Sequence, residues 1–402
     1  MPLLAQSGYG RAEKIQKGLK SGCIKGVILS PRDEEPAKLK DFSAELRETY
    51  NDALILFDPQ FYATTVLCPR DQNLPSYDYY NNNKGLSRTK FTPQGIQRYV
   101  SEALAFQNSV QELSYYISPT VIFEDFRDSW SQISLGLAEQ AIEHWSKDLS
   151  RNKPLLCSLA ISEFAFRNRE GLDEFLDAIS AWDVNGFYLL INRNSTSSNA
   201  IFDSTALGNI LYFIHVLSRI NNYEVFCGYS DWHSFILEAV GASHTACGWF
   251  QNLKNFSMSR FLPAGRARQP RKRYSSGPLL SSILINPELE AVYSIGSLPT
   301  ALSGTSHDSI LVNHGPAAGE QFWSGEVACL SHWETISSIA SSLSGQPASK
   351  QLELATNKIN MAKTLFRSFQ QREIIFDPST GPNHLDIWLQ AIQNFKNSIS
   401  SF

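Results

Sequence analysis

Residues 26–62 constrain the fold of this chain most, because they predict a strand, a helix and a second strand in succession. The first apolar run covers residues 26–29, and the second covers residues 53–57. Between them, apolar residues recur at helical spacings of three and four: Leu39, Phe42, Leu46 and Tyr50. Apolar runs without alternation are typical of strands buried on both faces. We therefore expect a parallel βαβ unit, with polar strand ends that meet on one rim.

The same strand–helix pattern continues through residue 263. We expect strands at residues 3–6, 26–29, 53–57, 120–123, 155–161, 186–191, 225–227 and 243–247. Eight such units predict an α/β fold of the (β/α)8 TIM-barrel type, spanning residues 1–263. An open doubly wound sheet is the weaker alternative. It would need a glycine-rich first turn, and the segment from Gly8 to Gly10 matches that motif only in part.

Three further regions stand out along the chain. The loop at residues 63–92 is rich in Asn, Tyr, Pro and Ser, and its length and aromatic content favour a lid or a binding loop. Residues 264–319 form a basic connection rich in Gly, Ser and Pro. Residues 320–402 carry apolar residues at helical spacing. We expect this last region to be a mainly helical extension packed on the barrel.

The overall composition narrows the class of protein. The chain has 402 residues, 43% of them hydrophobic, and a net charge of −4, so no global field draws it to nucleic acid or membrane. Its six cysteines show neither zinc-ligand spacing nor a disulfide framework. No signal peptide and no membrane-spanning run is evident. These features predict a soluble, cytoplasmic protein.

Carboxylates at the predicted strand ends are the candidate catalytic groups, because barrel active sites form at the C-terminal ends of the strands. They are Asp33, Asp58, Asp125, Glu163 and Asp231. Such residues supply the acid, base or nucleophile of glycosyl transfer and hydrolysis. Asp58 and Asp125 follow adjacent strands and form the favoured pair. The structural alternative is that these carboxylates cap helices or pair with arginines.

Ten other rim residues are candidate substrate contacts: Gln6, Arg32, Gln60, Tyr62, Arg127, Asn192, Arg193, Tyr229, Trp232 and Trp249. The arginines suit phosphate, and the aromatic residues suit stacking on a base or sugar. The basic segment that contains Arg266, Arg268, Arg271, Lys272 and Arg273 predicts contact with a nucleic-acid backbone. Ion pairing, packing and a flexible charged linker are the alternatives.

Some chemistries are disfavoured by residues missing from the strand ends. No predicted strand ends in Lys, so a Schiff-base mechanism has no nucleophile. Histidines are nearly missing from the rim, which disfavours a histidine-built metal site. The carboxylates would suit Mg²⁺, and the sequence identifies no other cofactor.

A barrel with rim aspartate pairs, and with neither Lys nor His at its strand ends, resembles base-exchanging transglycosylases that act on nucleic acid. The cysteine cluster that holds their structural zinc is missing from this chain. We expect an enzyme that acts on a nucleotide or nucleic acid, most specifically by N-glycosidic cleavage or base exchange. The alternative is a non-catalytic nucleic-acid-binding or scaffold subunit of a multiprotein complex, docked through its C-terminal helices. A sugar hydrolase is a third and weaker hypothesis.

Overall fold

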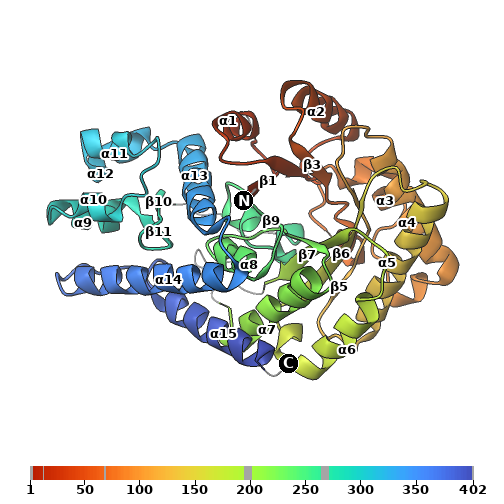
Figure 1. The fold of residues 1–402 in the computed structure, drawn as a ribbon. Helices are drawn as coiled ribbons and strands as arrows, with labels where there is room; N and C mark the ends of the chain where they lie inside the picture. Colours follow the sequence, from red (N-terminus) through yellow and green to blue (C-terminus); the bar gives the residue numbers. More distant parts are fainter. Residues whose placement is uncertain (1–2, 12, 68, 194–201, 264–270, 401–402) are drawn as a thin grey trace.

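The computed structural model describes residues 3–11, 13–67, 69–193, 202–263 and 271–400. Parallel strands lie at the centre, with helices outside them (Figure 1). The strands are β1 (Leu3–Gln6), β2 (Gly26–Leu29), β3 (Leu54–Phe57), β4 (Tyr116–Ile117), β5 (Ile122–Phe123), β6 (Leu155–Ser162), β7 (Gly186–Asn192), β8 (Glu224–Cys227) and β9 (His244–Cys247). Their order is β3-β2-β1-β9-β8-β7-β6-β4, and β5 also pairs with β6.

The sheet closes almost completely into a barrel. β4 and β5 both pair with β6, so together they occupy one strand position and the barrel has eight. Ser114, just before β4, bridges the remaining gap to β3. Its backbone N–H donates to the Ile55 carbonyl at 2.8 Å, and its hydroxyl accepts from the Ile55 N–H at 3.1 Å. The expected (β/α)8 fold with C-terminal helices is confirmed.

The fourth strand position differs from the expected strand at residues 120–123, because the structure divides it in two. Pro119 lies between the two pieces and has no N–H to donate to a strand ladder. Ser118 bridges the interruption. Its N–H donates to the Leu156 carbonyl at 3.0 Å, and its Oγ accepts from the Ser158 N–H at 2.9 Å. A proline in this position therefore shortens both pieces.

Gly26 begins β2 at a place where the neighbouring strand leaves no room for a side chain. A Cβ atom there would lie 2.1 Å from the Leu54 carbonyl oxygen. We expect Gly26→Ala to push β2 away from β3 and to lower the free energy of unfolding by about 1–3 kcal/mol. Urea denaturation measures this change. Gly325→Ala is the matched control, since nothing lies within 4 Å of its added Cβ. Equal stability of the two variants would contradict the prediction.

Seven helices of the outer ring follow strands in alternation. They are α1 (Lys14–Ser21), α2 (Pro36–Thr49), α4 (Pro93–Asn108), α5 (Ser129–Lys147), α6 (Arg169–Ile179), α7 (Ser204–His215) and α8 (Ser234–Val240). The expected loop at residues 63–92 contains the short helix α3 (Asp78–Asn81). Within this loop, Tyr77 and Tyr79 are buried against Phe57. Their ring centroids lie 6.0 and 6.4 Å from the Phe57 ring centroid. Packing on the barrel thus accounts for part of its aromatic content, and a role as lid stays a prediction.

The last helix of the ring does not follow β9 directly but comes from much later in the sequence. A hairpin of β10 (Arg273–Ser276) and β11 (Ser281–Leu284) comes first. The short helices α9 (Glu290–Ser294), α10 (Leu298–Ala301), α11 (Ser309–His314) and α12 (Pro316–Gly319) follow. Next, α13 (Gly325–Leu343) packs between α1 and α8, and the Trp333 indole donates to the Cys247 carbonyl of β9 at 3.0 Å. This helix takes the place of the eighth ring helix.

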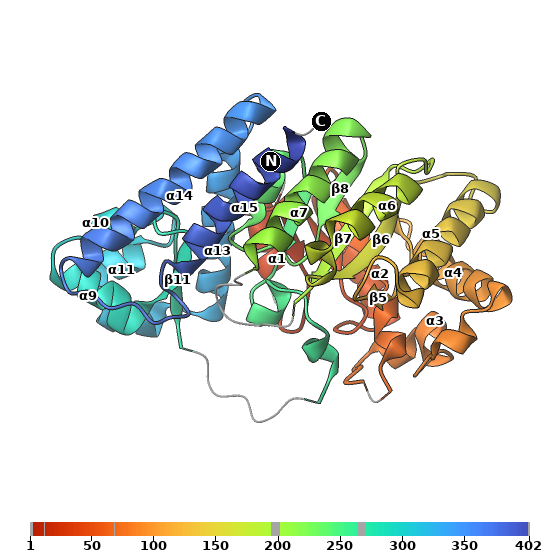
Figure 2. The ribbon, with the colours of Figure 1, turned by 90° about the horizontal axis from the view of Figure 1, so that it is seen from below.

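Two long helices complete the chain. α14 (Ala348–Gln370) packs on α8, and α15 (Asn383–Ile399) packs along α7 (Figure 2). Their apolar faces, which include Ile359 and Trp388, are buried in these contacts. The C-terminal helices therefore cover one side of the barrel.

Candidate functional site

Asp58 directly follows β3 and lies buried at the C-terminal end of the barrel, 1% exposed. Its Oδ1 accepts from the Gln60 N–H at 2.9 Å, and its Oδ2 accepts from the Tyr62 hydroxyl at 2.9 Å. Gln60 has a φ of 52°, in the left-handed region, so the chain turns sharply and brings both donors back to the carboxylate. The side chain of Gln60 then donates to the Ser30 hydroxyl at 2.9 Å. The turn after β3 thus fixes the position of Asp58.

Burial raises the pKa of Asp58 from 3.8 to about 6. Hydrogen bonds from Gln60 and Tyr62, together with the charge of Arg260, act in the opposite direction but are too weak to cancel it. A carboxyl group with this pKa keeps about one-tenth of its population protonated at pH 7. Such a group can donate and accept a proton near neutral pH, which is the property that general acid–base catalysis needs.

Other polar side chains are buried near Asp58. They include Gln6 on β1 and Tyr188 on β7, and Ser158 on β6 lies opposite Tyr188 in the strand register. Tyr188 is close enough to Gln6 and Asp58 for both to affect its pKa, which burial raises. This end of the barrel therefore holds a cluster of buried polar side chains around the Asp58 carboxyl group.

A second carboxylate, Asp33, sits in a buried network at the same rim. It accepts from the Ser30 hydroxyl at 2.7 Å and from the Arg32 guanidinium at 3.2 Å. The Arg260 guanidinium also donates to it. Arg32 further donates to the backbone carbonyl of Arg70 at 3.0 Å, so this side chain holds the 63–92 segment in place. Asp33 therefore organises two buried arginines.

The segment that follows β9 covers Asp58. Arg260 belongs to its 3₁₀ turn Met258–Phe261 and donates to the Tyr229 hydroxyl at 2.8 Å. The rings of Phe256 and Phe261 lie edge-on against Tyr62, with centroids 5.0 and 5.7 Å away. These contacts place the covering segment over the Asp58 carboxyl group, which is 1% exposed.

The favoured partner of Asp58 lies in a different environment. Asp125 is exposed, and its carboxylate accepts from the Arg127 N–H at 2.8 Å in a local turn. Arg127 is also exposed and pairs with Glu174 at 2.7 Å and Glu170 at 3.1 Å. No hydrogen bond among the described residues joins Asp125 to Asp58. Their pairing in catalysis stays a prediction.

Glu163, Asn192 and Arg193 hold the covering segment against the barrel. Glu163 and Arg193 form a buried ion pair at 2.8 Å. The backbone N–H of Arg193 donates to the Phe256 carbonyl at 2.8 Å, and the Asn192 side chain accepts from the Met258 N–H at 3.1 Å. These predicted site residues therefore have a structural role, whatever they contribute to binding.

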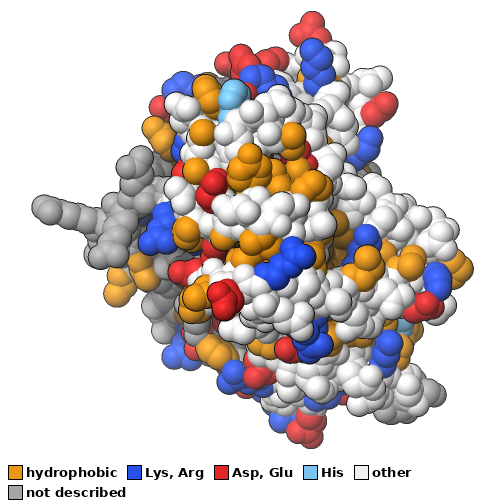
Figure 3. All heavy atoms as spheres, turned by 90° about the vertical axis from the view of Figure 1, so that its left-hand side faces the viewer, with side chains coloured by type: hydrophobic (Ala, Val, Ile, Leu, Met, Phe, Trp, Pro, Cys, Tyr) orange, Lys and Arg blue, Asp and Glu red, His pale blue; other side chains and the backbone are white. Residues whose placement is uncertain are grey.

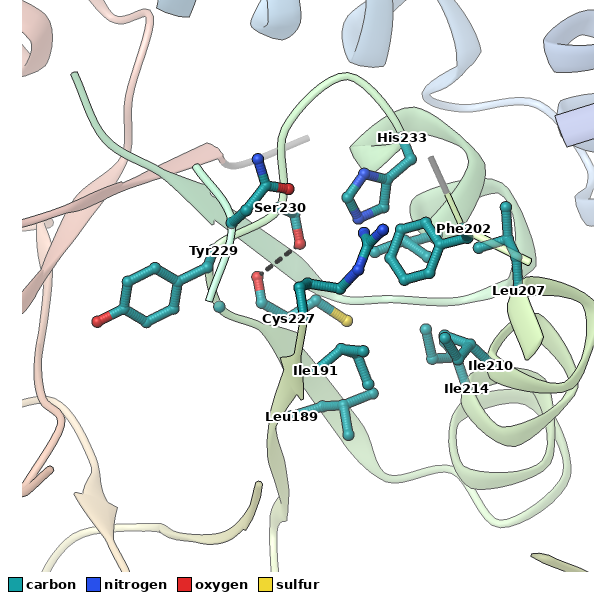
Figure 4. A pocket seen from close by; sticks show the side chains of 14 residues that line it. Leu189, Ile191, Phe202, Leu207, Ile210, Ile214, Cys227, Tyr229, Ser230 and His233 are labelled. Atoms are coloured by element: carbon teal, nitrogen blue, oxygen red, sulfur yellow. Dashed lines mark hydrogen bonds between the residues drawn. The ribbon is translucent and has the colours of Figure 1, made fainter. Parts of the chain in front are cut away.

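A small cavity of about 20 Å³ adjoins Tyr229, between the ends of β7 and β8 and the helices α7 and α8. His233 and Phe202 lie side by side in it, with ring centroids 5.0 Å apart (Figure 4). Burial lowers the pKa of His233 to about 3, so this imidazole is neutral. Asn255 also lines the cavity, and its amide has no partner among the described residues. The volume suits a single water molecule.

Asp231 and Trp232 join the barrel to the C-terminal extension. The Asp231 carboxylate lies 3.0 Å from His332 Nε2 of α13, and His332 Nδ1 lies 2.8 Å from the Ser275 hydroxyl of β10. The Trp232 indole donates to Ser282 of β11 at 3.0 Å. Asp231, His332 and Ser275 are all more than nine-tenths buried. We interpret this Ser–His–Asp chain as a structural link.

The electrostatics of the Asp231–His332 pair predict a large effect of removing His332. Burial opposes ionisation of Asp231, but Lys254 and His332 more than offset it and lower its pKa. In His332→Phe the carboxylate loses its direct partner. We expect the free energy of unfolding to fall by about 3–5 kcal/mol. Urea denaturation tests this, with His314→Phe on the exposed face of α11 as the control. A loss below 1 kcal/mol, as expected for a surface change, would contradict the link.

The remaining predicted contacts lie farther from Asp58. Trp249 is partly exposed and donates to the Tyr9 carbonyl at 2.9 Å. In the basic segment, Arg266 and Arg268 lie outside the described residues, and Arg271 is exposed. Lys272 donates to the Glu320 carbonyl at 2.6 Å, and Arg273 donates to the Ser282 carbonyl at 2.9 Å. Binding of nucleic acid by this segment stays a prediction.

Two members of the Asp58 surroundings were not expected from the sequence. Tyr188 lies within the apolar run of β7, where a tyrosine is usually a packing residue. Arg260 lies 13 residues after the end of β9 (260 minus 247), so it belongs to no predicted strand end. The one sequence feature that could have indicated a role for Arg260 is the aromatic residues close to it in the chain, Phe256 and Phe261.

Within the described residues, no group of three or more His, Cys, Asp or Glu side chains is arranged to hold a metal ion. The five described cysteines are buried and free. No helix in the described ranges is long and apolar enough to cross a membrane. A scan against protein-family models and a search of curated proteins both found no match to this chain.

Proposed function

We propose that this protein is an enzyme that cleaves or exchanges an N-glycosidic bond in a nucleotide or nucleic acid, with Asp58 as the general acid. The observation that carries the proposal is a buried carboxyl group of pKa about 6 at the C-terminal end of a (β/α)8 barrel, where such barrels hold their active sites, beside the buried polar side chains of Gln6 and Tyr188. A carboxylic acid that is partly protonated at neutral pH suits protonation of a leaving group.

In the proposed step, the Asp58 proton moves to a nitrogen of the departing base. The electron pair of the sugar–base bond leaves with that base, and the sugar becomes a cation. Water then attacks the cation and gives a proton to Asp58, which completes hydrolysis. In an exchange, a second base attacks through a ring nitrogen instead and gives the N–H proton of that nitrogen to Asp58. The Tyr62 hydroxyl, 2.9 Å from Asp58, stabilises the carboxylate that forms.

Gln6 has the chemistry to recognise a base at this site. Its amide offers one acceptor and two donors, and such an amide can pair with the edge of a nucleobase. Gln6 is fully buried and shares the neighbour Tyr188 with Asp58, so a base that accepts the Asp58 proton would lie within reach of this amide. Asp33, already held by Arg32 and Arg260, has a positioning role in this proposal.

Mass spectrometry of a nucleotide and nucleic-acid extract tests the proposal. The extract is incubated with wild type, with Asp58→Asn and with Asp177→Asn, an exposed control on α6. We expect a free or exchanged base with wild type and the control, but not with Asp58→Asn. Water labelled with heavy oxygen separates the two reactions, since only hydrolysis places the label on the sugar. Identical extracts after all three incubations would contradict the proposal.

A non-catalytic scaffold subunit is the second candidate, and one observation favours it. Tyr293, Val312 and Phe322 are each about half exposed on the extension. Apolar side chains appear among charged ones on that side of the molecule (Figure 3). A protein partner could bind there. If so, Phe322→Ser would abolish the cellular function while Asp58→Asn would leave it intact, the opposite of the result expected for an enzyme.

A further inference from the structure

Large apolar side chains are exposed around the end of the barrel that holds Asp58. They are Tyr9 after β1, Leu67 after β3, Phe164 after β6, and Phe250 and Leu262 after β9, with exposed fractions from 42% to 85%. Segments that follow parallel barrel strands all emerge at the same end. We call these five residues the mouth side chains.

Hydrogen bonds hold the segments that carry the mouth side chains against one another. The Trp249 indole donates to the Tyr9 carbonyl at 2.9 Å, which joins the segments after β9 and β1. The Arg70 N–H donates to the Phe261 carbonyl at 2.6 Å, which joins the segments after β3 and β9. These two bonds join the segments that carry Tyr9, Leu67, Phe250 and Leu262. The segment that carries Phe164 is joined to them through Glu163, since Glu163 pairs with Arg193 and the Arg193 N–H donates to the Phe256 carbonyl.

Cations accompany these side chains. Arg70, which follows β3, is exposed. The Arg167 guanidinium lies 4.8 Å from the centre of the Phe164 ring and pairs with Asp203 at 3.5 Å. The rim thus combines single exposed aromatic rings with positive charge. Surfaces that bind unpaired nucleic acid combine these features, because bases stack on rings and cations contact phosphates.

We propose that the mouth side chains bind an unpaired nucleic-acid strand, with bases stacked on Tyr9, Phe164 and Phe250 and with phosphates beside Arg70 and Arg167. This inference builds on the proposed function and names its substrate class. Asp58 lies beneath the rim, so a target base must leave any stack before it meets the acid. Unstacking costs least in a strand that is already unpaired. A protein partner fits less well, since protein interfaces gather their apolar area into a core, whereas the mouth side chains follow four separate strands.

Fluorescence anisotropy with short labelled oligonucleotides tests the proposal. The full chain carries Asp58→Asn, so the strand is bound without being consumed. Unpaired RNA and DNA are compared with duplexes of the same sequence. We expect Tyr9→Ala and Phe250→Ala each to raise the Kd for the unpaired strand by about 5-fold to 100-fold. Arg70→Ser should raise the Kd and lessen its dependence on salt. Phe322→Ala, an exposed ring on the extension, is the control and should leave the Kd unchanged.

Several results would overturn the proposal: no binding of the unpaired strand, tighter binding of the duplex, or equal losses in the Phe322→Ala control. Sedimentation velocity tests whether the rim binds a second copy of the chain instead. If wild type is a dimer and Phe250→Ala is a monomer, the rim is a dimer interface and the proposal is wrong. The chemistry is judged separately. If the unpaired strand binds but wild type shows no turnover, the binding surface is supported and the glycosidic step is contradicted. If free nucleotides are turned over but no strand binds, the glycosidic step is supported and the binding surface is contradicted.

Discussion

The Asp58→Asn protein is expected to be more stable than wild type at pH 7 and to turn over its substrate about 10²-fold to 10⁴-fold more slowly. The loss of turnover follows from the loss of the acid. The gain in stability follows from the cost of burying a charge, since the asparagine carries none and its side-chain oxygen can still accept from the Gln60 N–H. A residue that supports catalysis at the expense of stability behaves in this way.

The pH dependence of this gain has a definite sign. The folded protein raises the pKa of Asp58 from 3.8 to about 6, so it binds the proton more tightly than the unfolded chain does. The stabilising effect of this protonation is complete below pH 3.8 and is lost as the pH rises through about 6. The variant should therefore match wild type near pH 4 and exceed it by about 3 kcal/mol at pH 7. Urea denaturation at both pH values measures the difference. A variant less stable than wild type at pH 7 would contradict the burial of an ionisable Asp58.

Arg260→Met should have the opposite effect on stability. This change leaves the buried Asp33 with only one of its two guanidinium partners, and it removes the donor to Tyr229. We expect the free energy of unfolding to fall by about 3–5 kcal/mol. Arg151→Met, which breaks the exposed pair with Asp183, is the matched control and should cost under about 1 kcal/mol.

The same variant should move the pH profile of any remaining activity. Arg260 lowers the pKa of Asp58, so its removal raises that pKa further. The alkaline limb of kcat/KM should then shift to higher pH than the value of about 6 expected for wild type. An unchanged limb, or a stability equal to that of Arg151→Met, would contradict the coupling of Arg260 to the buried site.

Much of the barrel could be predicted from the sequence, because strands buried on both faces give unbroken apolar runs. Asp58, Gln60 and Tyr62 could be predicted to lie at a strand end for the same reason, since they follow such a run directly. At the fourth strand position only β5 could be predicted and β4 was missed, because Pro119 interrupts the apolar pattern.

The rest depends on contacts between residues that are distant in the chain. α13 completes the ring of helices, but its apolar face does not reveal which neighbours it will meet. The link from Asp231 to His332 likewise joins two positions that only the folded topology brings together. The sequence pattern of β7 predicts that Tyr188 is an ordinary strand residue, whereas the structure places it close to Asp58. Sequence patterns identify elements and strand ends, whereas partners within a buried site follow from the closed barrel.

The most direct test of this account is the titration of the Asp58 carboxyl group by NMR, with isotope-labelled aspartate in wild type and in Asp58→Asn. The account predicts one carboxyl signal that titrates near pH 6 in wild type and is missing from the variant. A wild-type spectrum in which every aspartate titrates near or below its ordinary value of about 3.9 would contradict it. In that case Asp58 would be an ordinary charged residue and not the acid of this site.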